Sequence, residues 1–248
     1  MITGAHKGTG YAIAQRFARE GWGVIVTSRS GENARAAAES IARESGGYAR
    51  GFACAAGDES QVVEIFEALR RENRLISALV LNAADLGMGQ NAFTVPLDQW
   101  MQVIGTNLGW NFSIMRQAAL HMKDRGGGAI AIIGSNTARR AIPDRSAYIA
   151  SKGGLVALSK ALAVEWGDDH IRVNVVVSGS IKTERWANQT EAWRQIRRDR
   201  APLGDIADFD DLANAAYFLC SDEAGIITGA ELCVDGGVDA QFLPKMAR

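Results

Sequence analysis

Cysteine, proline and histidine are scarce in this chain of 248 residues, which holds three cysteines, four prolines and three histidines. Cys54, Cys220 and Cys233 show no paired spacing, so we expect small buried thiols in a reducing compartment rather than a disulfide framework. The scattered histidines give little support to a protein-ligated metal site. Few prolines and no low-complexity linker or internal repeat predict a single domain over residues 1–248.

Net charge and long apolar runs are also nearly absent. The 27 Lys and Arg residues almost balance the 28 Asp and Glu residues, and the formal net charge of −1 argues against a general binder of nucleic acid or of anionic membranes. No apolar run reaches the ~18 residues that a membrane span needs, and no signal-peptide pattern opens the chain. We therefore expect a cytoplasmic protein whose partner is a small molecule.

Short apolar, β-rich runs alternate with longer helical stretches. This alternation predicts an α/β fold, a doubly wound parallel sheet of the Rossmann type with helices on both faces. Asp58, followed three residues later by Gln61, predicts a capping box at one helix start. The expected strands are 23–27, 49–53, 78–81, 129–133, 172–177 and 231–234, and the expected helices are 8–20, 32–45, 59–72, 97–123, 148–166 and 209–219.

Two segments are unusual for such a fold. Residues 178–208 contain no expected strand and follow the carboxyl end of one, where open α/β sheets bind their ligands, so we expect a substrate lid there. At the start, only Met1 and Ile2 precede a turn that a central strand should precede. A missing strand forfeits about four buried apolar side chains, each worth ~1.5–3 kcal/mol. We expect a truncated first strand, explained by a natural start upstream of Met1 or by compensating oligomer contacts.

The turn at the start is rich in glycine, since residues 3–10 read Thr-Gly-Ala-His-Lys-Gly-Thr-Gly. Gly4, Gly8 and Gly10 allow the backbone to turn tightly, approach a pyrophosphate and begin a helix whose positive end faces the phosphates. Taken alone, this pattern is a weak signal of nucleotide binding. It gains weight because a helix and then a strand are expected after it.

The end of the expected strand 23–27 bears on the choice between NAD and NADP. An NAD enzyme places an acidic residue about 20 residues into this unit, where this chain has Ser28 with Arg29 beside it. No carboxylate repels a 2′-phosphate there, and a guanidinium can pair with it. Lys7 adds a second basic position. The sequence favours NADP; the alternative is that both cations are ordinary surface charges and that NAD is used.

Three further side chains indicate acid/base chemistry. Tyr148 and Lys152 are four residues apart and share one face of a helix, where an ammonium can stabilise a phenolate near neutral pH. Ser135 follows an apolar strand, where its hydroxyl can hold a substrate oxygen. Each residue alone would be interpreted as structural, and only their joint spacing favours a catalytic set.

With Asn107 and the glycine turn, these residues resemble the short-chain dehydrogenase/reductase family. The stretches 172–175, 181–183, 227–229 and 235–237 also fall in family order, so the resemblance covers nearly the whole chain. It implies an oxidoreductase that moves a hydride between NADP(H) and a carbonyl or secondary alcohol, with Tyr148 as general acid/base. It further implies that Ser135 polarises the carbonyl and that Lys152 binds the nicotinamide ribose. Asn107 would hold a water in the proton relay.

The resemblance also implies the remaining cofactor contacts. Thr183 would contact the carboxamide and Asn82 would lie beside the adenine ribose. Departures from the family pattern are Ala55 for an Asp, Leu81 and Ala84 around Asn82, and Ser178 for a Pro, all near the cofactor. The expected cofactor contacts are Gly4, Lys7, Gly8, Thr9, Gly10, Ser28, Arg29, Asn82, Tyr148, Lys152, Gly179, Ile181 and Thr183, with no metal ligand.

Substrate and assembly signals are weaker. Helices 97–123 and 148–166 are expected to pack across a two-fold axis, with Phe242 and Leu243 in a second contact, which predicts a homotetramer or else a dimer. A non-catalytic nucleotide-binding scaffold is the alternative to an enzyme. Four arginines could bind an anionic substrate or be solvated or intersubunit residues, namely Arg139, Arg140, Arg145 and Arg185. A second set is expected to form an exposed helix face, namely Arg194, Arg197, Arg198 and Arg200.

Overall fold

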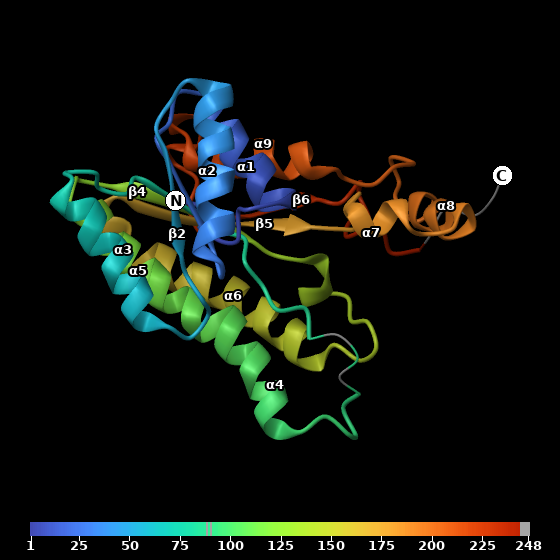
Figure 1. Cartoon of the computed structure of the whole chain (residues 1–248). Helices are drawn as coiled ribbons and strands as arrows, with labels where there is room; N and C mark the ends of the chain where they lie inside the picture. Colours follow the sequence, from blue (N-terminus) through green and yellow to red (C-terminus); the bar gives the residue numbers. More distant parts are fainter. Residues whose placement is uncertain (88, 90, 244–248) are drawn as a thin grey trace.

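A parallel sheet runs through the molecule with helices on both of its faces (Figure 1). The computed structural model describes residues 1–87, 89 and 91–243. The strands are β1 (Val24–Ser28), β2 (Ala49–Ala53), β3 (Ala78–Leu81), β4 (Gly128–Ile133), β5 (Ile171–Ser178) and β6 (Glu231–Val234). The helices are α1 (Gly8–Arg19), α2 (Gly31–Ser45), α3 (Glu59–Arg71), α4 (Leu97–Ile104), α5 (Trp110–Asp124), α6 (Ser146–Glu165), α7 (Glu184–Ala187), α8 (Glu191–Asp199) and α9 (Phe209–Cys220).

A single bridging residue, Ile2, joins the two parts of the sheet. β1 pairs with β2, the order β3-β4-β5-β6 forms the larger part, and the paired strands are parallel. Ile2 bridges Val26 on one side and Val80 on the other. The expected fold, a parallel sheet with helices on both faces, is confirmed.

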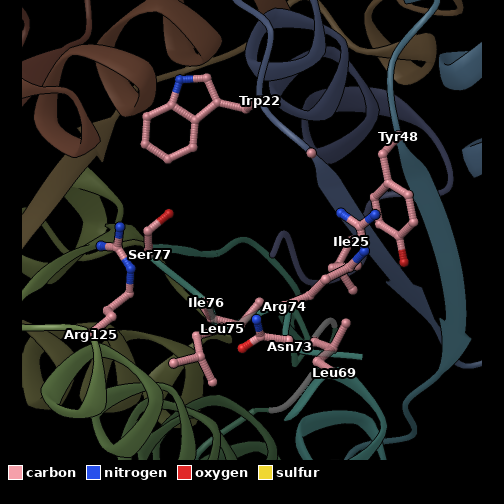
Figure 2. A pocket seen from close by; sticks show the side chains of 11 residues that line it. Trp22, Ile25, Tyr48, Leu69, Asn73, Arg74, Leu75, Ile76, Ser77 and Arg125 are labelled. Atoms are coloured by element: carbon pink, nitrogen blue, oxygen red, sulfur yellow. The ribbon is translucent and has the colours of Figure 1, made fainter. Parts of the chain in front are cut away.

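A cavity lies at the amino ends of the strands. This cavity of about 430 Å³ is lined by residues that precede β1, β2 and β3, among them Trp22, Tyr48 and Ser77 (Figure 2). The Met1 amino group is buried at the same edge and donates to the Ala78 carbonyl at 2.8 Å. Burial lowers the pKa of this amine to about 5. The cavity lies at the edge opposite the carboxyl ends of the strands, away from the candidate site.

Two apolar layers, one on each face of the sheet, pack the helices against it. The residues of β4 contribute alternately to the two layers. Ile130 and Ile132 point into the layer formed with α3, α5 and α6, whereas Ala129 and Ala131 point into the layer formed with α1, α2 and α9. This alternation follows from the two-residue period of a strand. Both layers are visible in Figure 1, with α1 and α2 on one side of the sheet and α3 and α5 on the other.

Several local expectations need correction. The expected helix 97–123 is divided by a π-helical segment, η1 (Gly105–Gly109). The capping box is half formed: Asp58 Oδ1 accepts from the Gln61 amide at 3.1 Å, but Gln61 Oε1 accepts from the Ala55 amide at 2.8 Å instead of closing the box. Cys54 and Cys220 are buried as expected, whereas Cys233 is exposed.

Helix α6 passes a membrane-span test by length and composition alone, the only helix of the described residues to do so. It is a core element in this fold, because Leu155 and Leu162 are buried in the layer that packs on β4 and β5. Lys152 is also buried along this helix, where it contacts the end of β4.

Close packing of β2 against α2 generates a stability prediction. A Cβ added to Gly51 would lie 2.2 Å from the Ala34 carbonyl carbon, and helix backbone cannot yield as a side chain can. We expect Gly51→Ala to lower the free energy of unfolding by about 1–3 kcal/mol. Gly109→Ala is the matched control, since Gly109 is exposed with nothing within 4 Å of an added Cβ. Denaturant unfolding of both variants checks this; an unchanged midpoint for Gly51→Ala would contradict the packing described.

Candidate active site

The ends of β4 and β5 lie against each other at the carboxyl edge of the sheet. Ser178 Oγ donates to the Gly134 carbonyl at 2.9 Å, and a Cβ on Gly179 would lie 3.6 Å from Asn136 Nδ2. The loop after β4 and the loop after β5 therefore share one edge. Beyond it, α7 and α8 extend past the end of β5 (Figure 1).

The glycine-rich turn is held to the end of β3 by side-chain hydrogen bonds. Thr3 Oγ1 accepts from the backbone amides of Asn82 and Ala83 at 3.0 and 3.1 Å. In return, Asn82 Nδ2 donates to the carbonyls of Thr3 and Gly4 at 3.1 and 3.3 Å. We expected Asn82 beside the cofactor; in the structure its side chain holds the glycine-rich turn in place. A Cβ on Gly10 would lie 2.6 Å from that Nδ2, so glycine is required there.

The start of α1 has the properties of an anion site. Its first turn contains no acidic residue, and its N-cap Lys7 makes no side-chain capping bond. Thr9 and Gly10 stand in that first turn, where backbone N–H groups point out of the helix. The positive end of the helix dipole therefore faces the turn without compensation.

Basic side chains from two elements gather next to this turn. Ser28 is buried at the end of β1, and Arg29 beside it is exposed. The pKa of His6 lies below its ordinary value, first because of burial and then because of the charges of Lys7 and Arg29. The charges of Lys7 and Arg29 thus both act on this imidazole. Arg35 is a further cation missed by the sequence argument, with its Nη1 3.2 Å from a Cβ built on Gly31.

Ser135 and Tyr148 are brought together as expected. Ser135 follows β4, is buried, and its Oγ accepts from Thr137 Oγ1 at 2.9 Å. Burial raises the pKa of Tyr148 above its ordinary value; a hydrogen bond with Ser135 and the positive charge of Arg145 partly offset this rise. Tyr148 is therefore a protonated phenol at neutral pH in this structure.

Lys152 lies one helical turn beyond Tyr148 and is buried. Its Nζ donates to the Ile133 carbonyl at 2.7 Å and lies 5.7 Å from the centroid of the Tyr148 ring. Burial lowers the pKa of Lys152 to about 8. The ammonium therefore lies between the end of β4 and the Tyr148 ring.

Asn107 is placed by the π-helical segment η1. Its Nδ2 donates to the Asp85 carbonyl at 2.8 Å and to Ser151 Oγ at 3.0 Å, and its Oδ1 accepts from the Asp85 amide at 2.7 Å. Ser151 in turn donates to the Tyr148 carbonyl at 2.7 Å. In this π-helical segment the backbone carbonyl of Asn107 accepts a hydrogen bond from the Asn111 side chain, whose Nδ2 donates at 2.7 Å. Asn107 thus links the loop after β3 to the helix that carries Tyr148.

The segment after β5 contains the expected cofactor positions and two short helices. Gly179 donates to the Val234 carbonyl at 3.1 Å, and Ile181 forms a bridge with Ala207. Thr183 is the N-cap of α7, and its side chain makes no capping bond. These three positions lie along the carboxyl edge, on the same side as Ser135.

Three of the four arginines expected on an exposed, solvated helix face are half-buried and have protein partners, whereas Arg200 is exposed as expected. Arg194 donates to the carbonyls of Trp186 and Ala187 at 3.1 and 2.6 Å and so caps α7. Arg198 pairs with Glu191 of its own helix. Arg197 Nη1 donates to Ser180 Oγ at 2.7 Å, at the end of β5. The sequence did not predict these tertiary contacts, by which the arginines connect α8 to α7 and to the end of β5.

The arginines between Ser135 and Tyr148 also have partners. Arg139 pairs with Glu231 and Asp239, and Arg140 donates to the Gln241 carbonyl at 2.6 Å. Arg145 donates to the Leu86 carbonyl at 2.6 Å. Arg139 and Arg140 therefore bind the C-terminal segment, so they are less available to bind an anionic substrate. Within the described ranges, no group of three or more His, Cys, Asp or Glu residues could hold a metal ion.

These features fit a nicotinamide dinucleotide. The turn offers a glycine cradle and an uncompensated helix start, the basic residues at the end of β1 suit a phosphate, and His6 Nδ1 is buried without a partner. A buried serine after β4 and a half-buried tyrosine on α6 suit a carbonyl oxygen. The fold and site define a dinucleotide-dependent oxidoreductase.

Comparisons with known proteins agree with this class. A family model described as enoyl-(acyl carrier protein) reductase matches residues 4–239. D-threitol dehydrogenase of Mycolicibacterium smegmatis is 36% identical over 241 residues, 96% of this chain and 91% of that protein. The chain belongs to the short-chain dehydrogenase/reductase family.

Solved structures show the same fold. A gluconate 5-dehydrogenase of Burkholderia cenocepacia, solved with NADP and tartrate, superposes with a TM-score of 0.90 at 28% identity, over 97% of this chain and 94% of that one. An NAD⁺-bound xylitol dehydrogenase superposes with a TM-score of 0.88 at 25% identity, over 95% and 96%. The structural neighbours thus include proteins with either cofactor, which leaves the choice to the residues of this chain.

Proposed function

We propose that this protein is an NADP(H)-dependent oxidoreductase that interconverts a carbonyl group and a secondary alcohol. The observation that carries the proposal is the placement of Lys152, buried one helical turn from Tyr148, with its Nζ 2.7 Å from the Ile133 carbonyl and 5.7 Å from the centroid of the Tyr148 ring. We treat residues 1–248 as one domain, with 178–208 as the substrate lid. The free cysteines of the described chain support a reducing compartment, and we propose the cytoplasm.

Each residue has a role that follows from its surroundings. The bound cofactor would supply or accept a hydride at its nicotinamide ring. Ser135 donates a hydrogen bond to the substrate oxygen, as an oxyanion-hole donor does. Tyr148, held protonated by burial, gives its proton to that oxygen during reduction. In the reverse direction the phenolate must form first, and it takes the proton from the alcohol.

Lys152 and Asn107 support the proton transfer. The Lys152 ammonium would bind the nicotinamide ribose and stabilise the phenolate left after the proton is given. Since burial lowers its pKa to about 8, this charge is present at neutral pH and lost above about 8. Asn107 acts chiefly by position, since its amide holds the loop at Asp85 and, through Ser151, the first turn of α6.

The cofactor contacts proposed from the sequence stay in this assignment. Gly4, Gly8, Thr9 and Gly10 would cradle the pyrophosphate, and Ser28 with Lys7 and Arg29 would hold the adenosine 2′-phosphate. The carboxamide end would meet the segment after β5. The contacts there are Gly179, Ile181 and Thr183, with Asn82 behind the turn.

The substrate class is suggested by the relatives. D-threitol, xylitol and gluconate, in the names of similar proteins, are polyhydroxylated alcohols or acids. We therefore propose that polyols, sugar acids and their carbonyl forms be tested first, followed by simple ketones, aldehydes and secondary alcohols. Arg145 and Arg197 have no carboxylate partner among the described ion pairs; they donate to the Leu86 carbonyl and to Ser180 Oγ.

Replacement of Tyr148 by Phe should lower kcat by at least about 10²-fold, because only the proton-transfer group is lost. NADPH affinity should stay nearly unchanged, whereas Lys152→Ala should weaken both turnover and cofactor binding. Tyr217→Phe in α9 is the matched control and should keep full activity. Steady-state rates and cofactor titration measure these effects, and appreciable kcat in Tyr148→Phe would refute the proton-transfer role.

Replacement of Arg29 by Asp should reverse or abolish the preference for NADPH over NADH. A carboxylate would repel the 2′-phosphate and accept the ribose hydroxyls, and the lost contact is worth about 10- to 100-fold in affinity. Arg43→Asp, at the far end of α2, is the control and should leave the preference intact. Tighter binding of NADH than of NADPH by the wild-type protein would overturn the NADP assignment.

We also propose that the chain assembles as a homotetramer, with a dimer as the alternative. Phe112 and Leu120 on α5 and Val164 on α6 are 40%, 50% and 85% exposed, which is a large apolar surface for a single subunit. Phe242 and Leu243 are exposed as well and could form the second contact. Light scattering should give a mass several times that of the 26.6 kDa chain. A monodisperse monomer at micromolar concentration would contradict this proposal.

A further inference from the structure

The turn that carries Ser135 ends in an arginine that the proposed mechanism does not use. Ser135 is the N-cap of the short helix η2 (Asn136–Ala138), and Arg139 is its C-cap. The Ala138 amide donates to the Ser135 carbonyl at 3.1 Å, and the Arg139 amide donates to the Asn136 carbonyl at 3.0 Å. Residues 135–139, the Ser135 turn, are thus one hydrogen-bonded unit. A displacement of Arg139 is therefore passed on to Ser135.

Two carboxylates from outside the Ser135 turn bind the Arg139 guanidinium. Its Nη2 lies 2.5 Å from Glu231 Oε2 on β6, and its Nη1 pairs with Asp239 Oδ2 in the segment that follows β6. The side chains of Glu231 and Asp239 are only 15% and 10% exposed, whereas that of Arg139 is 38% exposed. Because partly buried charges are screened less by water and salt, these contacts hold Arg139 more firmly than an exposed ion pair would.

Glu231 also binds the helix that carries Tyr148. Its other carboxylate oxygen, Oε1, lies 2.9 Å from Lys160 Nζ, further along α6. One carboxylate on β6 therefore joins the Ser135 turn to α6. The position of the serine hydroxyl relative to the phenol depends on both of these elements, so the shared carboxylate bears on the geometry of the site.

The second carboxylate partner of Arg139 is fixed by its own turn. The Asp239 amide donates to Asp235 Oδ2 at 2.7 Å, and the Gly237 amide donates to Asp235 Oδ1 at 2.9 Å. Asp235 is itself buried directly after β6. Both partners of Arg139 are therefore held by backbone structure, one in β6 and the other in the turn that follows it.

We propose that Arg139 is a positioning residue, which holds the Ser135 turn against β6 and α6 and so keeps the Ser135 hydroxyl in place relative to Tyr148. This inference rests on the proposed function, because it assigns to Arg139 an effect on turnover through Ser135. Misplacement of a reacting group by about 1 Å can lower a rate by about 10²-fold. Loss of Arg139 should cost less, about tenfold in kcat, because the hydrogen bonds within the turn remain.

Hydrogen exchange tests whether Arg139 holds the turn, and it needs no substrate. In Arg139→Gln, peptides that cover residues 134–142 should exchange about tenfold faster, because the turn opens more often once its ion pairs are lost. Arg70→Gln is the matched control, since Arg70 Nη1 lies 2.6 Å from Asp124 Oδ2 in an ion pair between α3 and α5. Its loss should leave exchange in these peptides unchanged. Equal exchange in the wild type and Arg139→Gln would overturn the inference.

A double-mutant cycle tests whether the effect reaches turnover through Ser135. The probes are D-threitol, xylitol and gluconate with NADP⁺, and the cycle uses the one that is oxidised fastest. Arg139→Gln should lower kcat about tenfold without changing the NADPH dissociation constant, and Arg139→Lys should lie between it and the wild type. In a Ser135→Ala background, Arg139→Gln should have little further effect, because the group that it positions is gone. Additive losses of kcat would overturn the positioning role.

Failure of this inference and failure of the proposed function give different results. A Ser135→Ala variant with the kcat of the wild type would contradict the proposed function. A Ser135→Ala variant that loses activity, beside an Arg139→Gln variant that keeps full kcat, would overturn the positioning role alone. Melting temperatures verify that each variant is folded, and Arg139→Lys takes the place of Arg139→Gln if the latter is not. Without turnover of any probe, the exchange measurement decides.

Discussion

Backbone hydrogen bonds of the first residues, between β1 and β3, hold the rest of the structure in place. Ile2 donates to the Ile25 carbonyl at 2.8 Å and accepts from the Thr27 amide at 3.1 Å, while Thr3 donates to the Val80 carbonyl at 3.0 Å. These few bonds join the pair β1–β2 to the four other strands. They also fix the position at which the glycine-rich turn begins, and hydrogen bonds of the Thr3 and Asn82 side chains hold the turn there. Few residues connect the two parts of the sheet. The side chains of Thr3 and Asn82 are therefore used in hydrogen bonds that hold this connection rather than in contacts with a ligand.

Burial then sets the chemistry at the carboxyl edge. The same desolvation raises the pKa of the Tyr148 phenol and lowers that of the Lys152 ammonium to about 8. Both shifts favour the neutral forms, so the two groups do not form a standing ion pair. The phenol is a proton donor at rest, and the ammonium becomes useful once the phenolate appears. A site poised in this way suits protonation of a substrate oxygen near neutral pH, where the ammonium is still charged.

The fold and the positions of the main site residues follow from the sequence because they depend on local patterns. The two-residue period of β4 and the spacing of Tyr148 and Lys152 are properties of one strand and one helix. Partners set by tertiary packing did not follow. The amide of Asn107 meets Asp85 through a π-helical segment that no residue type announces, and Arg194 and Arg197 bind carbonyl and hydroxyl groups rather than solvent.

A crystal structure of the protein with NADP⁺ would test the central claim most directly. The account predicts the pyrophosphate over the glycine-rich turn, the 2′-phosphate between Lys7 and Arg29, and the nicotinamide ring facing Tyr148 with its ribose on Lys152. A dinucleotide bound elsewhere, or one bound in this groove with its nicotinamide turned away from Ser135 and Tyr148, would contradict it.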